Sequence, residues 1–254
     1  RCFSSNEETL ASNDFQNQFE ETSSLSSIRA AVDSEFTNMI SVLSDHKIDH
    51  IVFEDIEYLG SPDAIFPNNW VTFHRDGTVV LYPMMSEKRR KERRHDIIES
   101  LSSFGFSVNK IIDISNLENA EYYLEGTGSM ILDRVSKKAY ACISSRTTSE
   151  ALTVFSNAMN YEIIEFSSST DIPIYHTNVM MSLGEETALV CFDVIKEREL
   201  STKLRLDLTY SGRTVLDVSV DQMNQFLCNS LEVRNNNNEK YLLMSETAEK
   251  SLTC

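Results

Sequence analysis

Apolar runs, turn residues and helical stretches follow one another along this chain in a recurring order. Two short apolar runs flank Asp76 and Gly77, a dipeptide that favours a tight β-hairpin between antiparallel strands. A stretch with helical spacing and a further apolar run come next. The predicted strand, strand, helix and strand occupy residues 70–73, 79–82, 86–103 and 108–112.

The same order of elements recurs twice further along the chain. In the second copy, the elements are expected at residues 129–132, 139–143, 148–159 and 161–166. In the third copy, they are expected at residues 179–183, 187–193, 195–206 and 214–218. Copies spaced by about fifty residues indicate a pseudo-symmetric α/β architecture that is built from one ββαβ unit.

The start of the sequence has the pattern of a partial copy of this unit. Apolar residues at helical spacing predict a helix over 26–43, and residues 49–53 are expected to supply its closing strand. Only residues 1–3 remain for the hairpin of that copy.

The end of the sequence has the pattern of another partial copy. Residues 230–233 and 240–244 are expected to form a hairpin, and Ser245 is expected to cap a helix that follows it. No further apolar run comes after that helix. We therefore expect residues 1–254 to form a single domain that is incomplete at its C-terminal end and lacks the closing strand of its fifth unit.

Composition and charge narrow the classes of partner. The chain has 254 residues, of which 41% are apolar, and this is enough for a substantial core. Its net charge of -16 disfavours nucleic acids and anionic membranes, which both require a basic face, and is a better match to a cationic small molecule. We interpret the basic run 88–95 as a solvated helix face. No apolar stretch approaches the ~20 residues of a membrane span, so no membrane partner is expected.

The five cysteines are far apart and show no spacing that is typical of a metal or redox site. We interpret them as reduced thiols, as expected of a cytoplasmic protein, with Cys142 and Cys191 as small core residues inside apolar strands. Four histidines show no paired spacing of metal ligands with one another, and these are His46, His50, His74 and His95. Neither a metal nor a cofactor is expected.

Three connecting segments contain residue types that ordinary turns do not combine. Each segment precedes the first strand of a unit, and they are residues 61–70, 123–129 and 175–178. The first places Asp63 and Asn69 in a stretch whose backbone is restricted by prolines. The second places Glu125 before two glycines, and the third places His176 where the chain enters a strand. Equivalent positions of a pseudo-symmetric ring converge near its axis, so Asp63, Glu125 and His176 are expected to meet in one site.

A structural interpretation of each residue stays open at this point. Asp63 also fits the polar position of a turn bounded by prolines, and Glu125 fits a solvated strand end. A single histidine among five is more often structural than catalytic. The segment 126–128 is no dinucleotide fingerprint, because it lacks the third glycine and is not expected to open a helix. The recurrence of these residue types at one point of successive units favours the functional interpretation.

These segments, in this order, resemble the amidinotransferase-like citrulline-utilisation hydrolases of the amidinotransferase and arginine deiminase superfamily, which has the pentein fold. The resemblance spans nearly the whole chain and rests on residues 13–16, 62–70, 124–133, 144–147, 175–181, 222–231 and 244–245. It implies a five-fold pseudo-symmetric α/β propeller of ββαβ units. It also implies an enzyme that modifies the guanidino or ureido group of an arginine- or citrulline-like small molecule, by hydrolysis or by amidino transfer.

The resemblance assigns catalytic roles to the residues of the connecting segments. The acid that binds the guanidinium or ureido group falls on Asp63, and the glutamate that supports the catalytic histidine falls on Glu125. The histidine, His176, would act as a general acid on the departing nitrogen and then as a general base on water. A thiolate would first attack the guanidino carbon and form a covalent adduct.

Three further residues are expected to bind the substrate. Arg146 matches the arginine of a Ser-x-Arg-Thr motif and is suited to holding a substrate carboxylate through a bidentate pair. Asn178 stands where arginine deiminases carry an acid two residues after the histidine. Asn69 completes the set from the segment that contains Asp63.

The nucleophile is not identified in this sequence. In relatives it follows a glycine-rich loop beyond the position that aligns with Cys254, while Cys2 stands where relatives usually have proline. Cys228 is the alternative nucleophile among the cysteines present. Two hypotheses therefore stand, an enzyme with a covalent Cys-His mechanism and a catalytically inactive binding protein with the pentein fold. The unpaired sheet edge that is expected at the end of the chain would also be compatible with a homo-oligomer.

Overall fold

The strands of the described residues form four small sheets, of which three repeat one topology. The computed structural model describes residues 6–9, 25–56, 60–170 and 174–252. In each of the three sheets, two antiparallel strands form a hairpin, and a third strand pairs in parallel with the second. The three sheets consist of β1 (Val71–Phe73), β2 (Thr78–Leu81) and β3 (Lys110–Asp113), then β4 (Met130–Asp133), β5 (Lys138–Cys142) and β6 (Glu162–Phe166), then β7 (Met181–Leu183), β8 (Thr187–Val190) and β9 (Thr214–Asp217).

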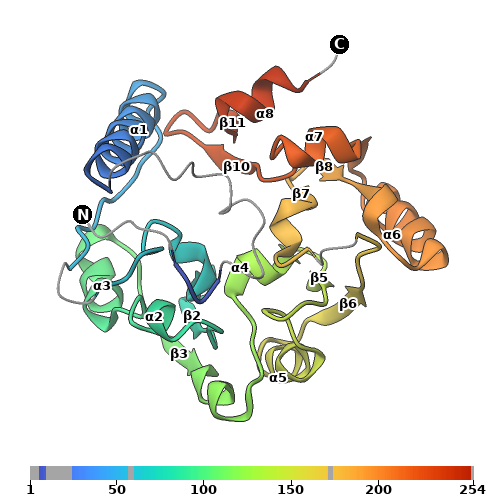
Figure 1. The fold of residues 1–254 in the computed structure, drawn as a ribbon, viewed down its shortest axis with the longest axis horizontal. Helices are drawn as coiled ribbons and strands as arrows, with labels where there is room; N and C mark the ends of the chain where they lie inside the picture. Colours follow the sequence, from blue (N-terminus) through green and yellow to red (C-terminus); the bar gives the residue numbers. More distant parts are fainter. Residues whose placement is uncertain (1–5, 10–24, 57–59, 171–173, 253–254) are drawn as a thin grey trace.

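Helices connect the second and third strands of each three-stranded sheet, and most of them lie toward the outside of a ring (Figure 1). They are α2 (Glu87–Arg90) and α3 (His95–Ser100) in the first unit, α5 (Ser149–Met159) in the second and α6 (Arg198–Tyr210) in the third. Shorter connections contain η5 (Leu101–Phe104), η6 (Ser115–Ala120), η8 (Phe192–Val194) and α7 (Val220–Asn224). No helix in the described part of the chain is long and apolar enough to cross a membrane.

The ring continues with a fourth sheet and one long helix (Figure 1). These elements are β10 (Leu231–Arg234), β11 (Lys240–Leu243), α8 (Glu246–Lys250) and α1 (Leu25–Asp45). Within the described residues, the ββαβ order is complete in three units. The mixed α/β architecture of repeated units is thus confirmed, whereas the five-fold symmetry and the absent closing strand stay predictions.

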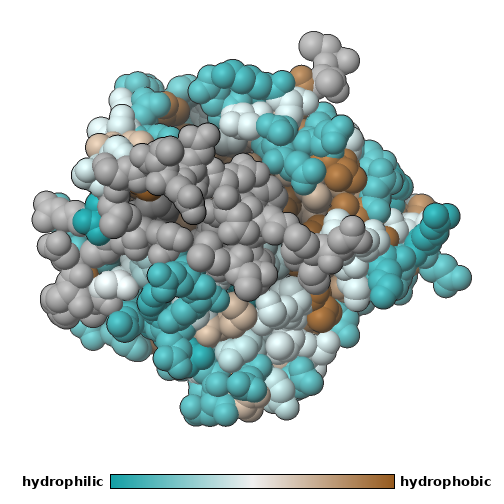
Figure 2. Space-filling view, viewed as in Figure 1, coloured by the Kyte–Doolittle hydropathy of each residue, from teal (hydrophilic) through white to brown (hydrophobic). Residues whose placement is uncertain are grey.

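The middle strand of each three-stranded sheet supplies much of the core. Strands β2, β5 and β8 are almost entirely buried, as expected of apolar runs that have a neighbouring strand on both edges. The largest hydrophobic cluster joins the second and third units, and its members include Tyr140, Met181, Val190, Leu204 and Leu208. Polar side chains prevail around the rim of the face in Figure 2. Apolar residues therefore pack between neighbouring units as well as within each unit.

The helix that was expected over 86–103 is divided in two. Helix α2 ends at Arg90, and α3 begins at His95. Around this break, Arg90 and Arg93 turn inward and donate hydrogen bonds to the carbonyl oxygens of Met84 at 3.0 Å and Tyr82 at 3.1 Å. These bonds hold the basic segment against the end of β2 and interrupt the helix.

The interpretation of residues 88–95 as a solvated face is wrong. Arg89 is buried, and Arg90 and Arg93 form ion pairs with Glu118. The guanidinium groups take this inward position because carboxylates elsewhere in the chain compensate for their lost hydration.

The prediction of a closing strand over residues 49–53 is also wrong. This segment belongs to no sheet of the described residues, and Ile51 and Val52 are 42% and 47% exposed. An apolar run becomes a strand only where a neighbouring strand satisfies its backbone groups. The expectations for residues 1–3, 13–16, Cys2 and Cys254 fall outside the described residues.

The turn of the fourth sheet connects it to the end of α1. The Asn235 side chain donates to the His46 carbonyl oxygen at 3.1 Å, and the Asn236 backbone N–H donates to the Lys47 carbonyl oxygen at 3.0 Å. The rings of His46 and Tyr241 meet edge-on, with centroids 5.1 Å apart. Segments from opposite ends of the sequence thus close the described part of the ring.

Replacing Asn235 with alanine should lower the free energy of unfolding by about 2 kcal/mol. The Asn235 side chain is buried, and its oxygen also accepts hydrogen bonds from the backbone N–H groups of Asn237 and Glu239. Urea denaturation would measure the change. The control is Asn236→Ala, because that side chain is exposed and makes one bond to Asp49. Equal losses for the two variants would contradict a special role of Asn235 in ring closure.

Candidate active site

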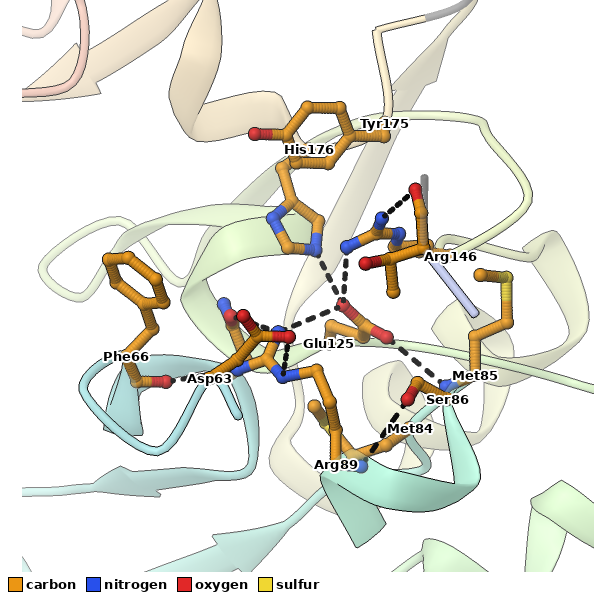
Figure 3. Close-up of polar contacts among 12 residues, drawn as sticks. Asp63, Phe66, Met84, Met85, Ser86, Arg89, Glu125, Arg146, Tyr175 and His176 are labelled. Atoms are coloured by element: carbon orange, nitrogen blue, oxygen red, sulfur yellow. Dashed lines mark hydrogen bonds and ion pairs between the residues drawn. The ribbon is translucent and has the colours of Figure 1, made fainter. Parts of the chain in front are cut away.

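The three connecting segments meet near the centre of the ring. Asp63 lies before η4 (Pro67–Asn69), Glu125 is the N-cap of α4 (Gly126–Ser129), and His176 is the N-cap of η7 (Thr177–Val179). Helix α4 packs against both η4 and η7. The side chains of Asp63, Glu125 and His176 therefore point toward one another (Figure 3).

The carboxylate of Glu125 is fully buried at the centre of this group. Its Oε2 atom lies 2.7 Å from Nε2 of His176 and 3.7 Å from Nη1 of both Arg89 and Arg146. Its Oε1 atom accepts a hydrogen bond from the Met85 backbone N–H at 3.1 Å. Burial opposes ionisation, but the His176 hydrogen bond and the two arginine charges outweigh it and lower the pKa of Glu125 to about 2. The carboxylate is ionised at neutral pH.

The imidazole of His176 is buried and neutral. Burial lowers the pKa of His176, and the adjacent Glu125 carboxylate offsets only part of this effect. Since an ionised carboxylate can only accept, Nε2 carries the hydrogen and donates it to Glu125. This leaves Nδ1 as the ring nitrogen that can take up or deliver a proton. Nδ1 faces Gly128, where an added Cβ would lie 2.9 Å from it.

Arg89 is a site residue that sequence reasoning missed. Its Nη1 atom donates to Oδ1 of Asn69 at 2.8 Å, and its Nε and Nη2 atoms donate to the Glu92 carboxylate at 2.9 and 3.0 Å. Its Nε atom also lies 3.7 Å from Oδ2 of Asp63. The three-residue spacing of Arg89 and Glu92 was the available signal, because it places both on one face of a helix.

Arg146 approaches Glu125 from another side. Its guanidinium lies over the ring of Tyr175 with its carbon 4.7 Å from the centroid, and Nη2 donates to the Thr9 carbonyl oxygen at 3.5 Å. Together with the distance of 3.7 Å to Glu125, this geometry makes Arg146 a charge partner of that acid. Its expected role toward a substrate carboxylate stays a prediction.

A short segment near the start of the chain also enters the site. Asn6 is fully buried, and its side-chain amide donates to Oδ2 of Asp63 at 2.9 Å and to the Ser86 hydroxyl at 3.2 Å. The Ser86 hydroxyl in turn donates to Glu8 at 2.6 Å. Asp63 thus has an amide donor on one side and Arg89 on another. Sequence reasoning missed Asn6 because the segment has no periodicity that could place it.

The two asparagines that were expected to bind substrate differ in position. Asn69 is buried beside Gly128, and its amide oxygen accepts the hydrogen bond from Arg89. Asn178 is half-buried in η7, and its backbone carbonyl accepts a hydrogen bond from Asn229 at 3.1 Å. The Asn69 side chain therefore joins the hydrogen bonds around Arg89. Asn178, by contrast, contacts Asn229 through its backbone carbonyl.

The described cysteines have environments unsuited to a nucleophile. Cys142, Cys191 and Cys228 are free and buried, and burial raises the pKa of the Cys142 thiol to about 12 and that of Cys191 to about 11. Burial also raises the pKa of Cys228, which lies in the largest hydrophobic cluster beside Cys191. A nucleophilic cysteine needs a lowered pKa, so the surroundings of Cys228 do not favour this role.

We refer to the central ionic residues as the site cluster, which consists of Asp63, Arg89, Glu92, Glu125, Arg146 and His176. With all acids ionised, three carboxylates face two guanidinium groups and a neutral imidazole. This composition suits a small cation and provides a ring nitrogen for proton transfer. Within the described ranges, no group of three His, Cys, Asp or Glu side chains could hold a metal ion.

Several solved structures are similar to this fold. The N-terminal domain of ArgZ, an arginine dihydrolase of the ornithine-ammonia cycle in cyanobacteria, has a TM-score of 0.61 at 15% identity, over 85% of this chain and 74% of that chain. The apo structure of ArgZ has a TM-score of 0.62 at 15% identity, over 86% of this chain and 32% of that chain. A dimethylarginine dimethylaminohydrolase adduct has a TM-score of 0.57 at 14% identity, over 80% and 72% of the two chains.

The amino-acid sequence identifies the family to which this chain belongs. Residues 1–254 match the family described as N,N dimethylarginine dimethylhydrolase, eukaryotic. No curated protein sequence matches the chain. The chain belongs to the eukaryotic N,N-dimethylarginine dimethylhydrolase family, within the amidinotransferase and arginine deiminase superfamily that has the pentein fold. At the level of the family, the chemistry is hydrolysis at a guanidino group.

Replacing Glu125 with glutamine should reduce the loss of stability in acid. The pKa of Glu125 is lowered from 4.5 to about 2 on folding, so its ionised form contributes stability above pH 4.5 that is lost as the pH falls through 2. Between pH 7 and pH 3, the unfolding free energy of the variant should therefore fall by on the order of 2 kcal/mol less than that of the wild type. Denaturant titrations at both pH values would measure this.

The control for Glu125 is Glu165→Gln, which replaces an exposed carboxylate of β6. That variant should keep the wild-type pH dependence. Identical acid sensitivity of Glu125→Gln and the wild type would show that the Glu125 pKa is not lowered by its partners.

Replacing Gly128 with alanine should separate His176 from Glu125. The new Cβ would lie 2.4 Å from Nδ2 of Asn69 and 2.9 Å from Nδ1 of His176, closer than side chains tolerate. We expect a loss of about 1 to 3 kcal/mol in stability and loss of the NMR signal of the hydrogen-bonded His176 Nε2–H. The control is Gly105→Ala. Gly105 has a positive φ, but the space around it is open, so an added Cβ would meet no neighbouring atom. Persistence of the signal in Gly128→Ala would contradict this packing.

Proposed function

We propose that this protein is a hydrolase that acts on the guanidino group of an arginine-like compound, including methylated arginines. The observation that carries the proposal is the buried contact of 2.7 Å between Glu125 and His176, next to a second carboxylate, Asp63. Family membership supports the same chemistry. Among the similar structures, AgrE is described in complex with L-arginine and ArgZ as bound to substrate.

The charge of the site supports recognition of a cation. The carboxylates of the site cluster exceed its guanidinium groups by one, and a bound guanidinium would balance the charge. Asp63 is the proposed ligand of that group. On binding, its nitrogens would replace or share the donors that Asn6 and Arg89 now present to Asp63.

The proposed reaction proceeds through a covalent adduct. Nδ1 of His176 takes the proton of a cysteine thiol, and the resulting thiolate forms a sulfur–carbon bond at the guanidino carbon. The imidazolium then delivers that proton to the nitrogen that leaves as ammonia or a methylated amine, as the bond between this nitrogen and the carbon breaks. His176 then removes a proton from water, the oxygen adds to the same carbon, and the sulfur–carbon bond breaks to leave a ureido product. The charge of Glu125 stabilises the imidazolium that each proton transfer requires.

The thiolate is the component that the described residues do not supply. Two similar ArgZ structures support a covalent step, since one is a cysteine-to-serine variant bound to substrate and another is covalently bound to a reaction intermediate. The burial of Cys142, Cys191 and Cys228 favours, as the second function, a binding protein that keeps the cation site without the chemistry. Incubation with N,N-dimethyl-L-arginine would separate the two: dimethylamine and a mass adduct on a cysteine indicate hydrolysis, and unchanged compound that still binds indicates the second function.

L-Arginine and N,N-dimethyl-L-arginine should raise the melting temperature of the protein, because a ligand that binds the native state stabilises it. Asp63→Asn should weaken the affinity by roughly tenfold or more, since a hydrogen bond to a charged group contributes about 1.5 to 3 kcal/mol. The asparagine can still accept the bond from Asn6, so the variant removes mainly the charge. Thermal unfolding and calorimetric titration would measure both effects.

The matched control is Asp133→Asn. Asp133 is also buried and paired with an arginine, Arg213, but it lies at the end of β4 outside the site cluster. Its replacement should lower stability without changing the affinity for either compound. If neither compound stabilises the wild-type protein, the proposed function is wrong.

A further inference from the structure

Glu92 is a buried acid that the reaction outlined above does not use. Its side chain is 1% exposed and holds Arg89 through two parallel hydrogen bonds, from Nε at 2.9 Å and from Nη2 at 3.0 Å. Such a bidentate pair fixes the plane of the guanidinium group. The remaining nitrogen, Nη1, is then directed at Asn69 and Glu125. Glu92 thus orients Arg89, whose Nη1 atom reaches the centre of the site cluster.

Glu92 also decides the net charge of the site cluster. When Glu92 is ionised, the carboxylates exceed the guanidinium groups by one; when it is protonated, the cluster is balanced. A single charge has a large effect on ligand binding where water is excluded. The proposed reaction converts a cationic guanidino group into a neutral ureido group, so the charge of the cluster distinguishes substrate from product.

We propose that Glu92 is a positioning residue that sets the preference of this site for a positively charged guanidino group over a neutral ureido group. This inference rests on the proposed function, because it concerns the same site. Ionised Glu92 favours binding of the substrate and release of the product. Protonated Glu92 leaves the cluster neutral and removes most of that preference.

The surroundings of Glu92 indicate the pH at which the preference changes. Burial raises the pKa of Glu92 to about 7; Arg89 acts in the opposite sense, and Asp63 and Glu125 add to the rise. Glu125 stays ionised and Arg89 stays protonated near that pH. The pKa of Glu125 is about 2, and carboxylates raise the pKa of Arg89 despite its burial. His176 stays neutral, because burial lowers its pKa.

The test compares L-arginine with L-citrulline, which differ in charge at the group that the site would hold. Isothermal titration calorimetry gives both dissociation constants for the wild type and for Glu92→Gln, at pH 6 and at pH 8. For the wild type, the preference for arginine should increase by roughly tenfold from pH 6 to pH 8. For Glu92→Gln, the preference should stay near the low-pH value of the wild type at both pH values.

The matched control is Glu118→Gln. Glu118 holds Arg90 and Arg93, which are neighbours of Arg89 in the chain, and it lies outside the site cluster. This variant should keep the wild-type preference and its pH dependence. A Glu92 with only a structural role would weaken the binding of both compounds equally and leave their ratio unchanged.

The possible outcomes separate this inference from the proposed function. An unchanged ratio in Glu92→Gln, or a wild-type ratio that does not vary with pH, would overturn the role of Glu92 alone. If Glu92→Gln does not fold, as judged by circular dichroism, the pH dependence of the wild-type ratio decides the matter. If the wild type binds neither compound at either pH, the proposed function itself is overturned.

Discussion

The burial of the Glu125 carboxylate is the constraint on which the centre of this structure depends. A charge that is removed from water must be paired, or it takes up a proton. Glu125 receives its partners from three units of the ring, and they are the backbone of Met85 and the side chains of Arg89, Arg146 and His176. A displacement of one unit would remove part of the compensation for this buried charge. Folding of the ring and assembly of the site are therefore coupled.

The same burial produces the chemical properties of the site. The exclusion of water keeps His176 neutral while its partner stays ionised, which is the pairing that a general acid and base requires. Close backbone packing makes this exclusion possible, since Gly128 leaves no room for a Cβ between Asn69 and His176. The protonation state of Glu92 then sets the net charge of the site cluster.

The repeated units could be predicted because their signals are local. Apolar runs on either side of a turn such as Asp76 and Gly77 predict hairpins wherever a partner strand lies nearby in the sequence, and all four sheets of the described residues contain such a hairpin. The apolar run at 49–53 gives the same signal but has no partner in the described residues. Arg89 was misplaced for a related reason, because a basic run is solvated by default and becomes buried only beside acids that fold against it.

The sequence by itself determined the order of elements in three ββαβ units and the residue types at the start of each. It also indicated that Asp63, Glu125 and His176 would converge, because equivalent positions of repeated units face one centre. Only the tertiary structure decided that Arg89 and Asn6 join them and that Cys228 lies in the hydrophobic core. The physical reason is range: hydrophobic periodicity is set by neighbours in the chain, whereas the partners of a buried charge come from segments that are distant in the sequence.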